Sequence, residues 1–174
     1  YKDRIICTDV KKNREVDPTE VHMGVPEKEA LRLMAAAADL TKHTVTVGDF
    51  KVAYLQGIEH KIGSEELAVL RDPVTSEVIL YWMDGEVYGK QPAGKRFKDK
   101  VEIKMAGNGF DETKNVDSIY LKENAVAFIY VDDPAVWARG DSLSESIAIE
   151  VEIWKYIAAN FDMKGEYTLS LIHI

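Results

Sequence analysis

The chain has 174 residues, 46% of them hydrophobic and 30% charged, which is enough for one globular domain with its own core. This composition excludes a collagen-like or wholly disordered chain, and no apolar run approaches the roughly 18–20 residues that a membrane helix needs. The formal net charge of -8 argues against nucleic-acid binding through the field of this chain alone. Cys7 is the only cysteine, which excludes an internal disulfide and predicts a reducing compartment.

The first fifty residues carry patterns for one helix and two short strands. Residues 5–7 are β-prone, and Pro26 followed by two glutamates is typical of a helix N-terminus. Residues 44–47 alternate and are β-branched, which predicts a strand that runs into Asp49. The apolar residues after Pro26 recur at helical spacing and share one face: Ala30, Leu31, Met34, Ala37 and Ala38.

The middle of the chain predicts a hairpin and one element of undecided type. Residues 58–90 have the pattern of two short strands around the turn residues Asp72 and Pro73. Residues 97–106 fit a helix through apolar positions four residues apart, but their second half also alternates as a strand does. The glycine-rich stretch 107–109 ends this element in either case.

A second hairpin is predicted from the longest apolar run. Residues 125–131 are nearly all apolar, which indicates a buried strand, and residues 135–138 resume a β-like pattern. Asp132, Asp133 and Pro134 separate the two runs, so two adjacent carboxylates are expected at the hairpin tip.

The clearest helix signal follows this hairpin. Ser142 and Glu145 have the spacing of a capping box. We expect one apolar stripe at helical spacing along the helix, formed by Leu143, Ile147, Val151, Trp154, Ala158 and Phe161. Residues 167–174 alternate and predict a closing strand.

The order of these elements predicts an α+β fold. With a helix at 97–106, the chain from residue 44 reads strand, helix, strand, strand, helix, strand. This is the ferredoxin-like arrangement, an antiparallel sheet with two helices on one face. The first strand then lies beside the hairpin, so Asp49 is expected near Asp132 and Asp133.

Three converging aspartates would have a definite chemistry, although an Asp–Asp pair alone is uninformative. The chain has 14 aspartates, so about one adjacent pair is expected by chance, and such pairs usually lie on solvated turns. Three like charges held close together need neutralisation by protons or cations. Carboxylate oxygens select Mg²⁺, or Mn²⁺ in its place.

Two segments that carry these aspartates resemble a known family. Residues 128–133, FIYVDD, resemble the YVDD motif of retroelement reverse transcriptases. Residues 49–57, DFKVAYLQG, are similar to the D-V-K-x-A-F-L-N-G block of copia-type LTR retrotransposons. These two matches bring all three aspartates into the resemblance.

Four further segments keep the order of the same family and extend the resemblance over essentially the whole chain. YKDR at residues 1–4 resembles Y-K-A-R, and VYGKQ at 87–91 resembles L-Y-G-L-K-Q. Gly109-Phe110 with the DSIY of 117–120 is similar to the family's L-G-F…D-x-S-L-F segment, and FDMKG at 161–165 to F-x-M-K-D.

The resemblance implies a polymerase palm with partial fingers in one reverse transcriptase domain over residues 1–174. Residues 1–43 and 58–90 would be mainly fingers-like, and residues 44–57 and 91–174 would form the palm. The implied activity is RNA-directed DNA synthesis, the nucleotidyl transfer of dNTPs to a primer 3′-OH.

The resemblance also implies residue roles and cofactors. Asp49, Asp132 and Asp133 would be the catalytic and metal-binding residues for two Mg²⁺ ions. Tyr54 would exclude a ribose 2′-OH, and Gln91 would contact the incoming nucleotide. Lys2 and Arg4 would correspond to the basic residues of the fingers that bind the triphosphate.

Partners and location follow from the same resemblance. The chain would bind an RNA or DNA template-primer as part of a Gag-Pol-like polyprotein with thumb, RNase H and integrase portions, inside a cytoplasmic retroelement particle and with no membrane partner. Tyr1, which is not a methionine, is interpreted as lying within such a longer polypeptide. The other domains would then supply much of the phosphate contact that this acidic chain lacks.

Two other functions remain open from the sequence. The stretch around Gln91 departs from the family, since a leucine is missing before Lys90 and the order of residues 92–94 is changed. This favours, as an alternative, a decayed and inactive copy that acts at most as a binding module. A second alternative is another palm-type nucleotidyl enzyme, such as a cyclase or an RNA-templated RNA polymerase.

A group of basic residues around and after Gln91 allows two interpretations. These side chains are either contacts to template phosphates or part of an ordinary solvated loop: Lys90, Lys95, Arg96, Lys98 and Lys100.

Overall fold

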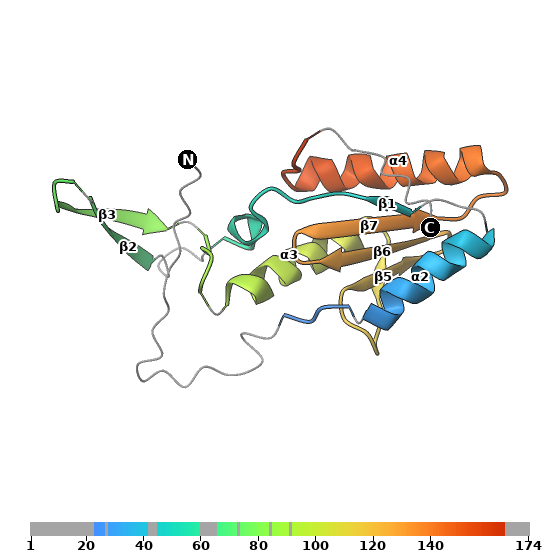
Figure 1. Cartoon of the computed structure of the whole chain (residues 1–174), viewed down its shortest axis with the longest axis horizontal. Helices are drawn as coiled ribbons and strands as arrows, with labels where there is room; N and C mark the ends of the chain where they lie inside the picture. Colours follow the sequence, from blue (N-terminus) through green and yellow to red (C-terminus); the bar gives the residue numbers. More distant parts are fainter. Residues whose placement is uncertain are drawn as a thin grey trace.

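The protein is an α+β structure in which helices cover both faces of one antiparallel sheet (Figure 1). The computed structural model describes residues 23–26, 28–41, 45–59, 66–72, 74–83, 85–90 and 92–165. Its elements in chain order are α2 (Lys28–Thr41), β1 (Val45–Val47), the 3₁₀ helix η1 (Ala53–Gln56), β2 (Glu66–Arg71), β3 (Val78–Met83), α3 (Ala93–Gly107), β4 (Asp111–Glu112), β5 (Ile119–Lys122), β6 (Ala125–Tyr130), β7 (Asp133–Ala138) and α4 (Leu143–Asn160). The β-prone run at 5–7 and the closing strand expected at 167–174 lie outside the described residues.

The main sheet has the strand order β1-β7-β6-β5-β4, and every neighbouring pair is antiparallel. β1 therefore lies beside the hairpin of β6 and β7, as the ferredoxin-like order predicts. β4 and β5 extend the sheet beyond β6 and were not predicted.

Alternate residues of the strands enter two separate cores. Ala127 and Val136 pack with residues of α3 and α4, whereas Phe128 and Ala135 pack with Met34 of α2. Because successive side chains of β6 and β7 point to opposite faces of the sheet, each strand supplies side chains to both cores. This explains why residues 125–131 are almost all apolar. The two helices expected on one face are α3 and α4, and α2 covers the opposite face.

The undecided element at 97–106 is a helix. Phe97, Val101 and Met105 are all buried, one turn apart, and they line the face of α3 that meets the sheet. Gly109 has a φ of 79°, in the left-handed region that glycine adopts freely, and it turns the chain into β4.

The N-terminus of α4 is capped as predicted, but its buried face differs from the expected stripe. Ser142 Oγ accepts a hydrogen bond from Glu145 N at 3.2 Å. Leu143 is 49% exposed, while Ser146 and Glu150 are fully buried. The hydroxyl of Ser146 and a carboxyl oxygen of Glu150 accept hydrogen bonds from Gly140 N and Ala138 N. These backbone donors need acceptors, so Ser146 and Glu150 point toward the sheet. The buried face of α4 therefore differs from the predicted apolar stripe.

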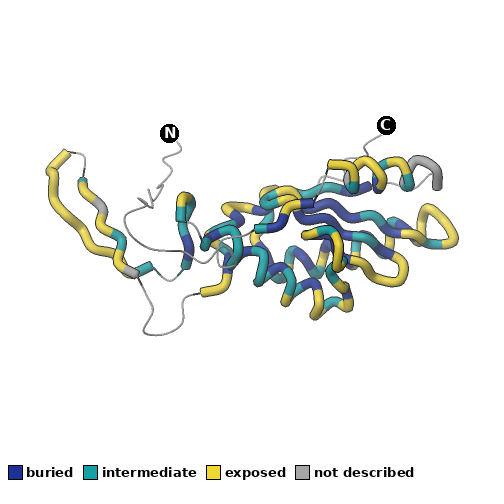
Figure 2. Tube along the Cα trace, turned by 90° about the horizontal axis from the view of Figure 1, so that it is seen from below, coloured by how far each residue is buried: buried dark blue, intermediate teal, exposed yellow. Residues whose placement is uncertain are grey.

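The predicted hairpin at 58–90 forms a separate two-stranded sheet of β2 and β3, which Figure 2 shows away from the buried core. Its turn is closed by Asp72, whose carboxyl oxygen accepts hydrogen bonds from the backbone N–H groups of Val74 and Thr75. One face of this hairpin is exposed and apolar, with Leu67, Val69, Val78, Leu80 and Trp82 on it.

Among the described helices, none is both long and apolar enough to cross a membrane.

The carboxyl group of Glu150 is buried between α4 and the end of β7. One oxygen accepts the hydrogen bond from Ala138 N at 3.2 Å, while the other, also buried, has no hydrogen-bond partner among the described residues. Burial raises the pKa of this carboxyl from 4.5 to about 7, against the smaller lowering effects of the nearby Thr46 hydroxyl and of the hydrogen bond from Ala138. The group is therefore largely protonated in the folded protein below neutral pH.

This raised pKa predicts that folding stability falls as the pH rises. In the unfolded chain the carboxyl loses its proton near pH 4.5, but in the folded chain only near pH 7. The contribution of this group to folding stability is therefore fully present below pH 4.5, and it is lost progressively as the pH rises from 4.5 to about 7. The loss amounts to at most about 3 kcal/mol. We expect Glu150→Gln, which mimics the protonated group, to be more stable than the wild type at pH 8 but not at pH 4.5. Urea unfolding across this range measures the difference, and a difference that does not change with pH would contradict the assignment.

Candidate functional site

Backbone hydrogen bonds place Asp49 beside the tip of the β6–β7 hairpin. Gly48 N donates to Pro134 O at 2.8 Å and Phe50 N donates to Asp132 O at 2.7 Å, so the chain carrying Asp49 continues along the start of β7. Because Tyr130 pairs with Asp133, the tip is a two-residue loop of Val131 and Asp132. The expected approach of Asp49 to the Asp132–Asp133 pair is therefore present in the fold.

An aromatic cluster under the sheet fixes this segment. Phe50 is buried, and its ring centroid lies 5.0 Å from that of Phe161 and 5.6 Å from that of Phe97. Since Phe97 is on α3 and Phe161 follows α4, both helices hold the residue next to Asp49. The side chain of Asp49 is left 43% exposed and points away from the core.

The three carboxylates act on one another electrostatically. The pKa of Asp133 is raised, first by partial burial and then by the negative charges of Asp132 and Asp49, while Lys164 acts in the opposite direction. The like-charge repulsion that the sequence predicted is thus present at this point.

Asp49 forms an ion pair with Lys164, which the sequence analysis did not assign to the site. Its Nζ lies 2.7 Å from Asp49 Oδ1 and 2.9 Å from Oδ2. The contact with Asp49 is the largest cause of the raised pKa of Lys164. The signal for it was already in the sequence, because Lys164 is the lysine of the FDMKG segment at 161–165.

The donor types at this point suit a hard divalent cation, but their arrangement does not enclose one. In the part of the chain that the structure describes, no group of three or more His, Cys, Asp or Glu side chains is placed to hold a metal ion. Asp49, Asp132 and Asp133 offer the carboxylate oxygens that Mg²⁺ selects. However, Lys164 contacts both oxygens of Asp49, so an ion that approached this carboxylate would meet the positive charge of the ammonium.

Tyr54 lies close to two other tyrosines, Tyr88 and Tyr130, and to Asp132. The ring of Tyr54, on η1, lies 5.0 Å from that of Tyr88, centroid to centroid. The pKa of Tyr54 is raised by burial first, then by the charge of Asp132 and by the neighbouring Tyr88 and Tyr130. Tyr54 thus lies near Asp132, where the family resemblance requires a residue that touches the incoming sugar. The other expected substrate-binding residues, Lys2, Arg4 and Gln91, lie outside the described residues.

The basic residues around the start of α3 are mostly paired with acids. Lys95 Nζ lies 2.6 Å from Asp99 Oδ1, and Arg96 Nε lies 3.0 Å from Glu86 Oε1. Lys98 Nζ contacts three acidic residues, Glu102, Glu112 and Asp117, at 3.2–3.3 Å. These pairs neutralise much of the positive charge that the sequence offered for template phosphates.

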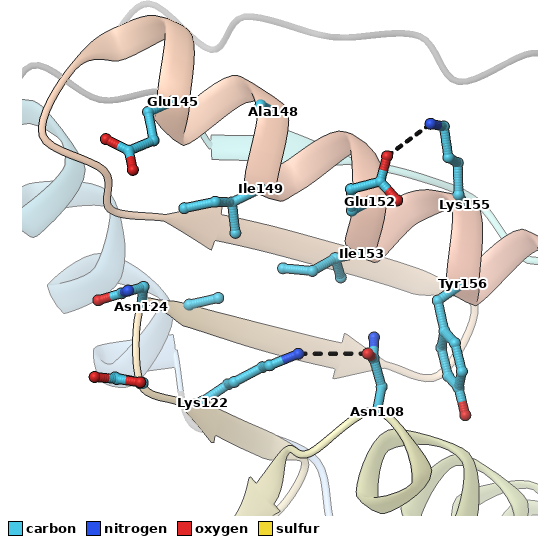
Figure 3. A pocket seen from close by; sticks show the side chains of 12 residues that line it. Asn108, Lys122, Asn124, Glu145, Ala148, Ile149, Glu152, Ile153, Lys155 and Tyr156 are labelled. Atoms are coloured by element: carbon cyan, nitrogen blue, oxygen red, sulfur yellow. Dashed lines mark hydrogen bonds and ion pairs between the residues drawn. The ribbon is translucent and has the colours of Figure 1, made fainter.

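A groove of about 750 Å³ lies at the other end of β6, between α4 and the β5–β6 turn (Figure 3). Ile149 and Ile153 line it from α4, and several of its charged side chains have partners: Lys122 bonds Asn108, and Lys155 pairs with Glu152. None of the residues predicted for the site lines this groove. The carboxylate cluster at residues 49, 132 and 133 is therefore the better candidate.

Both segments that carry the aspartates contain a β-branched residue in an unfavourable conformation. Val52 has φ 49° and ψ 53°, and Val131 has φ 54°. The left-handed region costs an L-residue about 1–2 kcal/mol, and it is uncommon above all for β-branched side chains. Strain of this kind gathers at functional sites, where the surrounding structure holds it in place.

Comparison with known proteins adds no assignment: no protein-family model, no curated protein and no solved structure matches this chain. Any function must therefore be argued from the residues and from their geometry.

Relief of the strain at Val52 should stabilise the protein. Asparagine tolerates the left-handed region, so we expect Val52→Asn to raise the free energy of unfolding by about 1 kcal/mol. Val74→Asn is the matched control, since Val74 is an exposed valine in the β2–β3 turn, and it should change stability by less than about 0.5 kcal/mol. Urea unfolding measures both variants, and equal effects would show that Val52 is not strained.

Proposed function

We propose that this chain is the palm, with part of the fingers, of a copia-type reverse transcriptase. The observation that carries the proposal is the approach of Asp49 to the Asp132–Asp133 loop, where the three carboxylates act on one another. Support comes also from the six sequence motifs in family order and from the antiparallel sheet with α3 and α4 on one face.

In this proposal each carboxylate has a defined task. Asp49 and Asp132 would hold two Mg²⁺ ions, and Asp133 would support them from the start of β7. When bound, such ions lower the pKa of the primer 3′-OH and neutralise the charge of the leaving pyrophosphate. The protein contributes the fixed positions of its carboxylates, which the hydrogen bonds of Gly48 and Phe50 secure.

Tyr54 would select deoxynucleotides. Its ring contacts Tyr88 on one side and Phe97 on another, with centroid distances of 5.0 and 6.5 Å, so it is held rather than free to swing away. A ring fixed near Asp132 would clash with a 2′-OH and would reject ribonucleotides by steric exclusion.

A second candidate is a catalytically inactive relative that binds without reacting. The observation that favours it is the contact of Lys164 with both oxygens of Asp49, together with the changed residues around Gln91. In this case the carboxylates would be satisfied by the protein itself, and no synthesis would occur.

Primer extension with an RNA template, dNTPs and Mg²⁺ tests the first candidate. We expect Asp132→Asn to reduce the extension rate by at least about a hundredfold, since the variant loses a carboxylate that would hold the Mg²⁺ ions. Asp141→Asn changes an exposed aspartate before α4 and serves as the matched control, with an unchanged rate. A wild-type chain without activity would favour the inactive relative, and an unaffected Asp132→Asn would refute the role of Asp132.

The choice of sugar provides a separate test of Tyr54. Replacement of Tyr54 by Ala removes the ring, so we expect the ratio of rNTP to dNTP incorporation to rise by about tenfold or more. Tyr156→Phe, on α4, is the control and should leave the ratio unchanged. Robust rNTP incorporation by the wild type would instead support an RNA polymerase.

A further inference from the structure

The carboxylate cluster already contains a cation of its own. The ammonium group of Lys164 lies within 2.7–2.9 Å of both oxygens of Asp49. The other groups that interact with this ammonium are Asp132 and Tyr88, and its charge also acts on Asp133. Lys164 therefore supplies positive charge to all three carboxylates.

Backbone contacts hold Lys164 in this place. Lys164 N donates to Asp49 O, and Lys51 N donates to Asp162 O, both at 2.8 Å, while Phe50 and Met163 form a β-bridge. The segment 162–164 thus lies antiparallel to residues 49–51.

A side chain fixes the same segment from η1. The amide of Gln56 donates to Asp162 O at 2.9 Å and accepts from Asp162 N at 2.6 Å. By contrast, Lys155 is an ordinary surface lysine whose ion pair, with Glu152, lies within its own helix. The position of Lys164 is thus built into the fold.

From these contacts we infer that Lys164 is an internal counter-ion that competes with a divalent cation for Asp49. A cation that binds Asp49 must come close to this ammonium, because the ammonium contacts both carboxylate oxygens, and the two positive charges repel each other. Lys164 thereby lowers the affinity of the cluster for the cation and keeps the metal-free state neutralised. The inference rests on the part of the proposed function that places a cation at these carboxylates, but it does not require polymerase activity.

The expected size of the effect follows from exposure. The side chains of Lys164 and Asp49 are 52% and 43% exposed, so solvent screens their contact and it is easily broken. Loss of the ammonium also leaves one more uncompensated negative charge beside the cation. We therefore expect removal of the charge at position 164 to tighten cation binding by about five- to tenfold, rather than by several orders of magnitude.

Titration of the whole chain with Mn²⁺, with free Mn²⁺ measured by electron paramagnetic resonance at low salt, tests the inference. Lys164→Gln should bind Mn²⁺ about five- to tenfold more tightly than the wild type, and Lys164→Arg should bind about as the wild type does. Lys155→Gln removes the same charge from an exposed lysine on α4 and should change nothing. Asp49→Asn should weaken binding in either background.

A second measurement does not depend on the folding of a variant. In the wild type, the ¹⁵Nζ signal of Lys164 should move toward that of a free lysine as Mg²⁺ is added. An affinity of Lys164→Gln equal to that of the wild type, or an unmoved Nζ signal at saturating Mg²⁺, would overturn the inference, as would the absence of Mn²⁺ binding in every variant. Tighter Mn²⁺ binding by Lys164→Gln without DNA synthesis by any variant would keep the inference and reject the polymerase.

Discussion

The candidate site depends on one constraint, the closeness of like charges at the edge of a sheet. The hydrogen bonds of Gly48 and Phe50 fix the chain after β1 along the hairpin tip, and they hold the backbone of Asp49 beside the Asp132–Asp133 pair. Buried aromatic rings under Phe50 make the arrangement rigid. The ammonium group of Lys164 contacts Asp49 and offsets part of the repulsion among the carboxylates.

Much of this arrangement could be predicted from the sequence, because it depends on strong local patterns. The apolar run at 125–131, the break at Asp132 and the capping box at Ser142 each define an element, and their order places β1 beside the hairpin. The sequence alone could not decide whether α3 is a helix or a strand, because its apolar residues fit both periodicities. The tertiary structure shows that it is a helix.

Other features carried too weak a signal. β4 has only two residues, Asp111 and Glu112, and neither has a strand preference, so its pairing depends on β5. The inward positions of Ser146 and Glu150 follow from unpaired backbone donors at the end of β7, which periodicity does not reveal. Lys164 was visible in a motif, but its partner lies 115 residues away in the chain.

The β2–β3 hairpin has a practical consequence for work with this chain in isolation. Trp82, 68% exposed, and its apolar neighbours on the same face have no cover from the described part of the chain, and two strands alone are only marginally stable in water. Both strands of this hairpin are edge strands, and an exposed edge strand can pair with strands of other molecules. Concentrated preparations are therefore prone to cluster through the hairpin, and dilute samples will give the cleanest measurements.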